Sequence, residues 1–130
     1  MTSPDPEQGL KLHAKANLDP ALFGGRVFFS FPEGDPPGPL LTIEQVAGGR
    51  DDYVPLEDPR LSVSVWARKK EDASKGRRAL VDYLTSLEGV KLDSVTVCKS
   101  VSNVQTVYLR DPDGQYCRYI VDFTMHAAGL

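Results

Sequence analysis

The strongest constraint on the fold is a strict alternation of side chains at residues 61–66. One side of this extended segment carries Leu61, Val63 and Val65, and the other side carries Ser62, Ser64 and Trp66. A period of two predicts a β-strand whose first side faces a hydrophobic core. Trp66 lies on the opposite side, where its large apolar surface also has to be covered. The sequence leaves open whether another layer of the same chain or another subunit covers it.

The composition is that of one globular domain, and we expect residues 1–130 to form it. Of the 130 residues, 41% are hydrophobic and 25% are charged. A chain of this length buries roughly two-thirds of its unfolded surface, which is enough for one core. The net charge of −3 argues against binding to nucleic acid or an anionic membrane through bulk charge. The apolar runs are short and residues 1–9 lack a signal pattern, so we expect neither a membrane span nor secretion.

Hydrophobic spacing and turn residues predict the remaining elements. Asp5 and Pro6 indicate a short helix that runs to about residue 17. The clearest helix covers residues 70–88, where five small or apolar side chains recur at threes and fours: Ala73, Gly76, Leu80, Leu84 and Leu87. The last residues, HAAGL, are expected to be a frayed tail. Strands are expected at residues 26–31, 40–47, 61–67, 95–101, 104–110 and 115–125, with a break near residues 102–103 between two of them.

The order of these elements predicts an α+β fold. We expect a mainly antiparallel, twisted sheet of about five strands, with one long helix packed on one face and a short N-terminal helix. In the strand at 26–31, alternation places Val27, Phe29 and Phe31 on one face.

Several apolar side chains fall on strand faces that are otherwise polar: Phe28, Trp66, Tyr108, Tyr116 and Ile120. The N-terminal helix could cover them within one molecule. That helix is short and weakly apolar, so burial against another molecule is the favoured interpretation. Aromatic anchors of this kind carry much of the binding energy at protein interfaces.

The sequence contains no strong signal for a metal, a cofactor or catalysis. Four carboxylates lie close together at Asp51, Asp52, Glu57 and Asp58, but their spacing is not that of a Ca²⁺ loop and a solvated acidic loop is favoured. His13 and His126 are expected to be solvated. Cys98 and Cys117 are expected to be buried, reduced thiols, and their separation is not set by the sequence. Motifs for phosphate binding, zinc hydrolysis or a nucleophilic serine are absent, so we expect no cofactor.

Segments of the chain nevertheless resemble a known family. A short helix is followed by GGRVFFSFP at 24–32, GGRDDYVPLEDPRLSVSVWA at 48–67, a helix with ALVDYLTSL at 79–87, and a terminal hairpin. From about Leu10 to Met125 the chain resembles the small tail terminator proteins of long-tailed phages, also called tail completion or head-tail joining proteins. The likeness is greatest to those of flexible, non-contractile tails, and residues 48–66 are its most specific part.

The resemblance implies a structural virion protein without enzymatic activity. Proteins of this family form hexameric rings that cap the tail tube, stop its polymerisation and join the tail to a head-side connector or stopper protein. DNA passes through the ring as cargo, without specific binding. We therefore expect a protein located at the tail-head junction of the virion and assembled in the host cytoplasm, with itself, the tail tube protein and the connector as partners.

On this interpretation, subunit or ring contacts are expected at Arg50, Asp51, Asp52, Tyr53, Phe28, Trp66 and Tyr116. Asp111 and Asp113, at the tip of the predicted hairpin, are expected to face the lumen or the connector, where an acidic balance would repel the phosphates of passing DNA. One alternative is another neck protein, such as a connector or stopper. A second is a small ligand-binding or enzymatic α+β domain, which would need a concave pocket with a perturbed titratable group. Ring stoichiometry, the surface that faces the tube, and the phage and host are not set by the sequence.

Overall fold

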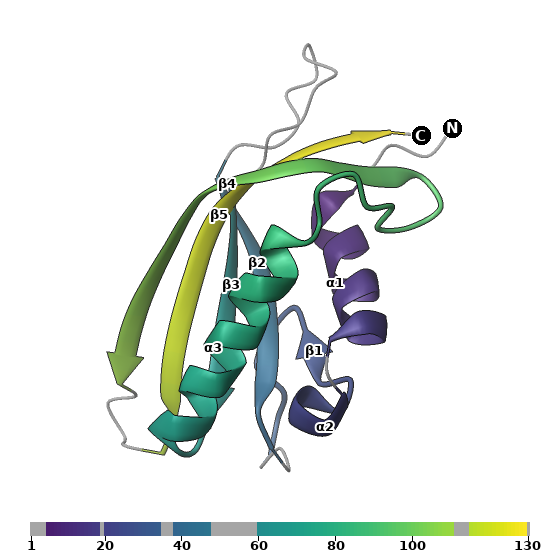
Figure 1. Cartoon of the computed structure of the whole chain (residues 1–130). Helices are drawn as coiled ribbons and strands as arrows, with labels where there is room; N and C mark the ends of the chain where they lie inside the picture. The colour runs from purple at the N-terminus through teal and green to yellow at the C-terminus, as the bar shows by residue number, and fades with distance from the viewer. Residues whose placement is uncertain (1–4, 19, 35–37, 48–59, 111–114, 130) are drawn as a thin grey trace.

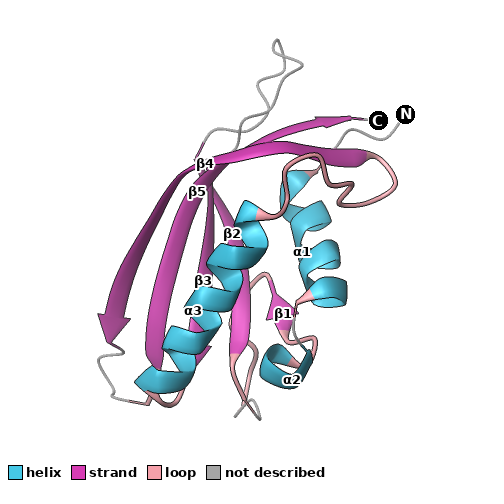
Figure 2. Cartoon of the chain, viewed as in Figure 1, coloured by secondary structure: helices cyan, strands magenta, loops and turns pink. Residues whose placement is uncertain are grey.

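A computed structural model describes residues 5–18, 20–34, 38–47, 60–110 and 115–129. Helices α1 and α3 lie on one face of a mostly antiparallel sheet, which confirms the expected α+β fold (Figures 1 and 2). In chain order the elements are α1 (Pro6–Asn17), α2 (Pro20–Phe23), β1 (Val27–Phe28), β2 (Leu40–Ala47), β3 (Arg60–Ala67), α3 (Lys70–Thr85), β4 (Thr96–Arg110) and β5 (Cys117–Gly129).

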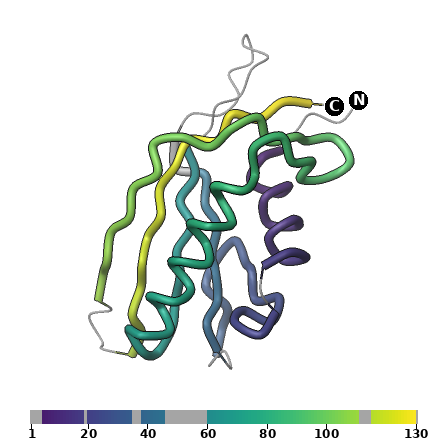
Figure 3. Tube along the Cα trace, in the orientation of Figure 1, coloured from purple at the N-terminus to yellow at the C-terminus, as the bar shows by residue number. Residues whose placement is uncertain are grey.

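The strands of the described residues form one five-stranded sheet in the order β1-β2-β3-β5-β4. Strand β1 runs parallel to β2, and every other neighbouring pair is antiparallel. Strands β4 and β5 are the longest, and their traces run side by side along the sheet (Figure 3). Strand β4 therefore lies at one edge of the sheet and the short strand β1 at the other.

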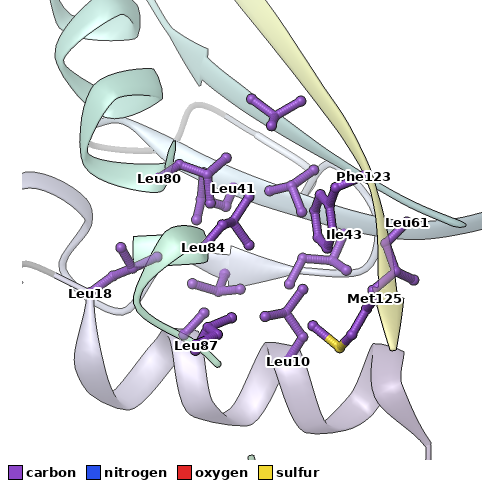
Figure 4. Packing of buried hydrophobic residues seen from close by; sticks show 14 of the residues in the cluster. Leu10, Leu18, Leu41, Ile43, Leu61, Leu80, Leu84, Leu87, Phe123 and Met125 are labelled. Atoms are coloured by element: carbon purple, nitrogen blue, oxygen red, sulfur yellow. The ribbon is translucent and has the colours of Figure 1, made fainter. Parts of the chain in front are cut away.

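The hydrophobic core lies between the two helices and one face of the sheet. The predicted inward side chains of β3 are buried, and they lie opposite Phe123, Val121 and Tyr119 of β5. Leu10 of α1 and Leu84 of α3 pack into the same cluster (Figure 4). The alternation at residues 61–66 thus reports correctly which side of β3 faces the core.

The two helices also meet through a polar contact. Nδ1 of His13 in α1 lies 2.6 Å from the hydroxyl of Tyr83 in α3. Burial lowers the pKa of His13 and raises the pKa of Tyr83, so the phenol keeps its proton and can donate a hydrogen bond to the neutral imidazole. The prediction that His13 is solvated is therefore wrong.

The start of α1 is confirmed. The amide of Gln8 donates a hydrogen bond of 3.1 Å to the Asp5 carboxylate, and Pro6 occupies the first turn. The far end of α3 differs from the prediction, because the helix ends at Thr85 rather than residue 88. Leu87 is still buried beyond the helix, and the chain turns at Gly89 with a φ of 76°. Hydrophobic periodicity continues past the helix because the following turn also packs against the core.

Three strand predictions also change. The segment at 26–31 is a regular strand only at Val27–Phe28. The two strands expected at 95–110 are one, β4, with a register shift between Ser102 and Gln105 and a φ of 54° at Asn103, at the predicted break. Residues 126–129 are not a frayed tail: they belong to β5, and Ala127 is buried opposite Cys98. His126 lies in this strand too, with Nε2 3.1 Å from the Ser102 hydroxyl, so it is not simply solvated.

The two cysteines lie at opposite ends of the β4–β5 hairpin. Cys98 pairs with Ala127, whereas Cys117 pairs with Arg110, and both thiols are free. The ten positions of β5 between Cys117 and Ala127 correspond to roughly 33 Å, far beyond the reach of a disulfide. Cys98 is buried as predicted, while Cys117 is only half-buried. Among the described helices none is long and apolar enough to cross a membrane.

The packing of α3 on β3 gives a first prediction. A Cβ at Gly76 would lie 2.6 Å from Cγ1 of Val65 and 3.2 Å from Cζ of Phe23, and both neighbours are fully buried. We expect Gly76→Ala to lower the free energy of unfolding by about 1–3 kcal/mol, because overpacking outweighs the helix propensity of alanine. Chemical denaturation would measure it, with the exposed Lys75→Ala as control. A more stable Gly76→Ala would contradict this packing.

The His13–Tyr83 contact gives a second prediction. Folding lowers the pKa of His13 below its ordinary value of 6.5, so the unfolded chain binds more protons as the pH falls. This contribution to stability is complete above pH 6.5 and is lost as the pH falls towards the lower pKa of the folded state. When the pH is lowered from neutral to mildly acidic, the midpoint of thermal unfolding should fall less for His13→Gln than for the natural chain. Equal losses would show that His13 does not carry the effect.

Candidate assembly surface

The face of the sheet that lies away from α1 and α3 is called the outer face here. Strand register places Thr42, Ser64, Ile120 and Val107 in one row across it. A neighbouring row holds Leu40, Trp66, Arg118 and Leu109. The predicted placement of Trp66 and Ile120 on this face is confirmed. Phe28, which pairs with Thr42, shares the face.

An aromatic cluster covers part of the outer face. The ring centroid of Phe31 lies 4.9 Å from that of Trp66 and 5.2 Å from that of Tyr116, with edge-to-face geometry in both pairs. Tyr116 is 8% exposed, and Trp66 is half-buried. The chain thus covers Trp66 in part with residues that follow β1. The N-terminal helix, offered above as a possible cover, packs on the opposite face.

Hydrogen bonds hold the Trp66 ring in place on the sheet. Its indole Nε1 donates to the Thr42 hydroxyl at 3.0 Å. Arg118 donates from Nε and Nη2 to the Ser64 hydroxyl at 3.1 and 3.0 Å, and its guanidinium carbon lies 4.4 Å from the centroid of Trp66. This network satisfies Ser64, which is only 3% exposed. A guanidinium has five donors, so Arg118 retains donors beyond these two bonds.

Beside this network the outer face is hollowed by a cavity of about 390 Å³. Its residues include Phe29, Phe31 and Trp66, the polar Thr42, Ser62 and Ser64, and the charged Glu7, Glu44 and Arg118. Phe29 is 40% exposed, and the Lys11 ammonium lies 4.4 Å from its ring centroid. An open hollow with apolar walls and a polar floor can receive a protruding side chain of a partner.

Among the described residues, the titratable groups with displaced pKa values lie away from the hollow. Besides His13 and Tyr83, burial raises the pKa of Cys98 to about 11, and a hydrogen bond to Cys117 raises the pKa of Tyr108. None of these four groups lines the hollow. The hollow therefore has the concave shape that a ligand-binding or enzymatic domain would need, without the perturbed group that this alternative predicted.

The expected position of Tyr108 on the outer face is wrong. Tyr108 pairs with Tyr119, which faces the helices, and the Lys70 ammonium of α3 lies 4.7 Å from the Tyr108 ring centroid. Its neighbours Val107 and Leu109 point to the outer face instead and are 49% and 43% exposed. Strand β4 lies at the edge of the sheet, where long basic side chains cover the helix-side face. Alternation in an edge strand therefore does not report the side of the core.

The remaining predicted residues fall into two groups. Six of them lie outside the described residues: Arg50, Asp51, Asp52, Tyr53, Asp111 and Asp113.

The structure brings Trp66 and Tyr116 together through Phe31. The role of Phe31 was missed because period-two alternation placed it on the same face as Val27. Pro32 was the signal, since a proline directly after Phe31 makes continuation of a paired strand unfavourable there. The contact between Arg118 and Ser64 carries no local sequence signal.

Comparison with known proteins now identifies the family. A family model described as tail completion protein gp17 matches residues 11–126. The chain belongs to this family. The match spans nearly the same residues as the resemblance noted in the sequence, and confirms it. Members are structural proteins of virions, and the chain accordingly has a structural role in tail completion.

A solved structure agrees with the fold of this tail completion family member. One chain in a structure titled "Virion of native gene transfer agent (GTA) particle" superimposes with a TM-score of 0.62 and 20% sequence identity. The match covers 92% of this chain and 90% of that chain. At such identity the likeness establishes a shared fold and nothing finer. No curated protein sequence matches the chain.

The contacts of Trp66 give a third prediction. Trp66→Ala removes the packing on Phe31, the contact with Arg118 and the bond to Thr42. We expect the free energy of unfolding to fall by about 1–3 kcal/mol. Chemical denaturation beside Leu12→Ala, which alters a residue that is 47% exposed, would test this. An unchanged stability would mean that Trp66 serves intermolecular contacts alone.

Proposed function

We propose that this protein assembles into a closed ring, a hexamer, that caps the phage tail tube. The ring stops addition of further tube subunits and offers a different surface to the connector or stopper protein of the head. Its action is geometric, with no enzymatic step and no cofactor. In this proposal the protein lies at the tail-head junction and lets DNA pass through the ring.

The observation that carries the proposal is the hollowed outer face on a chain of the tail completion family. A protein with this structural role has to bind other proteins, and Phe29 presents an apolar ring at a cavity of about 390 Å³. Contacts between unlike surfaces of neighbouring copies generate a closed ring when the rotation between copies closes. The hollow supplies one such surface.

The chemistry of the hollow favours a partner segment of mixed character. Phe29 and Phe31 can bury an apolar side chain, while Arg118 can meet a carboxylate with the donors that Ser64 does not use. Trp66, Phe28 and Tyr116 are proposed to support this contact from within the subunit. From the sequence, Arg50, Asp51, Asp52 and Tyr53 are proposed for subunit or ring contacts, and Asp111 and Asp113 for the lumen or connector.

The decisive experiment is electron microscopy of tubes assembled from the tail tube protein, with and without this protein. We expect shorter tubes that carry a ring at one end when the protein is present. Tubes of unchanged length without bound rings would contradict capping. Binding to the portal-side complex instead of tubes would favour the alternative of a connector or stopper.

A matched pair of variants gives a fourth prediction. Phe29→Glu places a carboxylate near Lys11, where it is tolerated in the single molecule, but this carboxylate cannot be buried against an apolar partner. We expect loss of tube capping with little change in thermal stability. Leu12→Glu is the control, because Leu12 is similarly exposed but does not line the hollow. Tube-length distributions for both variants would measure the difference, and normal capping by Phe29→Glu would exclude the hollow as a contact.

A further inference from the structure

The edge of the sheet at β2 is partly occupied by the molecule's own residues. Strand β1 pairs with β2 at Leu41 and Thr42, and the Leu41 amide donates to the Arg26 carbonyl at 2.9 Å. Beyond β1, the Gln45 amide donates to the Glu7 carboxylate at 2.6 Å. A strand from another molecule would have to displace β1 or this side chain before it could pair with β2.

At the opposite edge, most of strand β4 has no partner strand among the described residues. Its first residues are covered by the preceding turn, since Gly89 donates to the Cys98 carbonyl and Cys98 donates to the Val90 carbonyl, both at 2.8 Å. From Gln105 to Arg110 no segment of the described chain pairs with its outer side. Every second residue of such a strand directs its backbone N–H and C=O away from the sheet, where no other described strand accepts or donates to them.

Between Lys99 and Arg110, the side chains of β4 carry no charge that would protect this edge. Natural edge strands carry lysines, prolines or other charges that discourage pairing with another chain. Residues 100–109, SVSNVQTVYL, contain neither a charge nor a proline. Three β4 side chains are large, apolar and exposed: Val104, Val107 and Leu109. An edge with this composition is expected to be covered by another strand.

We propose that β4 pairs with β4 of a second copy of this chain, antiparallel and about a two-fold axis. Pairing between two sheets needs an open edge on each, and within the described residues only β4 offers an edge longer than the two residues of β1. The other edge strand, β1, has only two residues and offers too little backbone to extend the sheet, so addition stops after two copies. The dimer is the form of the free protein, and the inference does not depend on the ring.

Strand register restricts how the two copies meet. Residues that lie directly opposite each other across an antiparallel pair share a face of the sheet. Gln105, Val107 and Leu109 share the outer face. An axis at Val107 places this residue opposite its own copy and Gln105 opposite Leu109. This register buries the most exposed apolar side chain of the edge and keeps Arg110 away from its counterpart.

The first test is sedimentation equilibrium of the natural chain and two lysine variants. We expect a monomer–dimer equilibrium that Val107→Lys weakens by at least about tenfold, since two like charges would face each other at the axis. Leu12→Lys, at a residue of matched exposure on α1, should leave it unchanged. A natural chain that stays monomeric across the dilution series, or a dimer insensitive to Val107→Lys, would overturn the proposal.

Disulfide trapping tests the register. In a Cys117→Ser background, Val107→Cys should form a covalent dimer under mild oxidation, because directly opposite residues lie within disulfide reach. Leu12→Cys is the control and should remain monomeric. Absence of a covalent dimer of the Val107→Cys variant would overturn the register with Val107 at the axis. A tube-capping assay with Val107→Lys separates the proposed dimer from the proposed ring. If the variant no longer dimerises but still caps tubes, the ring proposal does not depend on the dimer.

Discussion

Burial of a single face of the sheet under α1 and α3 is the constraint on which the rest of the structure depends. Leu10 and Leu84 meet the apolar side of β3 and β5, and the absence of a side chain at Gly76 lets α3 approach Val65. Because both helices pack their apolar side chains on this face, they leave most of the outer face uncovered, and only polar side chains of α1 reach the hollow. The outer face therefore has to satisfy its own polar groups and present the remaining surface to solvent or to another protein.

The outer face meets this requirement with a small number of side chains. Arg118 satisfies the buried Ser64 hydroxyl and stacks on Trp66, while Phe31 covers the ring from the side. These contacts hold the Trp66 and Arg118 side chains without filling the face, so a hollow remains beside Phe29. Side chains that are already held in place lose little conformational entropy on binding, which suits a structural role in tail completion.

The two edges of the sheet differ in the same way as its two faces. Glu7 and β1 occupy the edge at β2, whereas β4 leaves its backbone groups open beyond the turn at Gly89. An assembly protein needs surfaces that associate and surfaces that do not, because unrestricted strand addition produces fibres. Within the described sheet, the outer face and the edge at β4 are the two surfaces on which the proposals above depend.

The sequence by itself determined the elements whose residues report their own burial: alternation at 61–66 identified β3, spacing at 73–84 identified α3, and Asp5 located the start of α1. Family membership was also visible in the order of segments. Only the tertiary structure decided that Phe31 covers Trp66, that Tyr108 lies under Lys70, and that His13 meets Tyr83. Each of these contacts joins residues far apart in the chain, so no local period or turn residue could reveal it. For residues 104–110 the sequence predicted the wrong face for Tyr108. None of these residues is buried on either face of the sheet, so their alternation does not indicate which side faces the core.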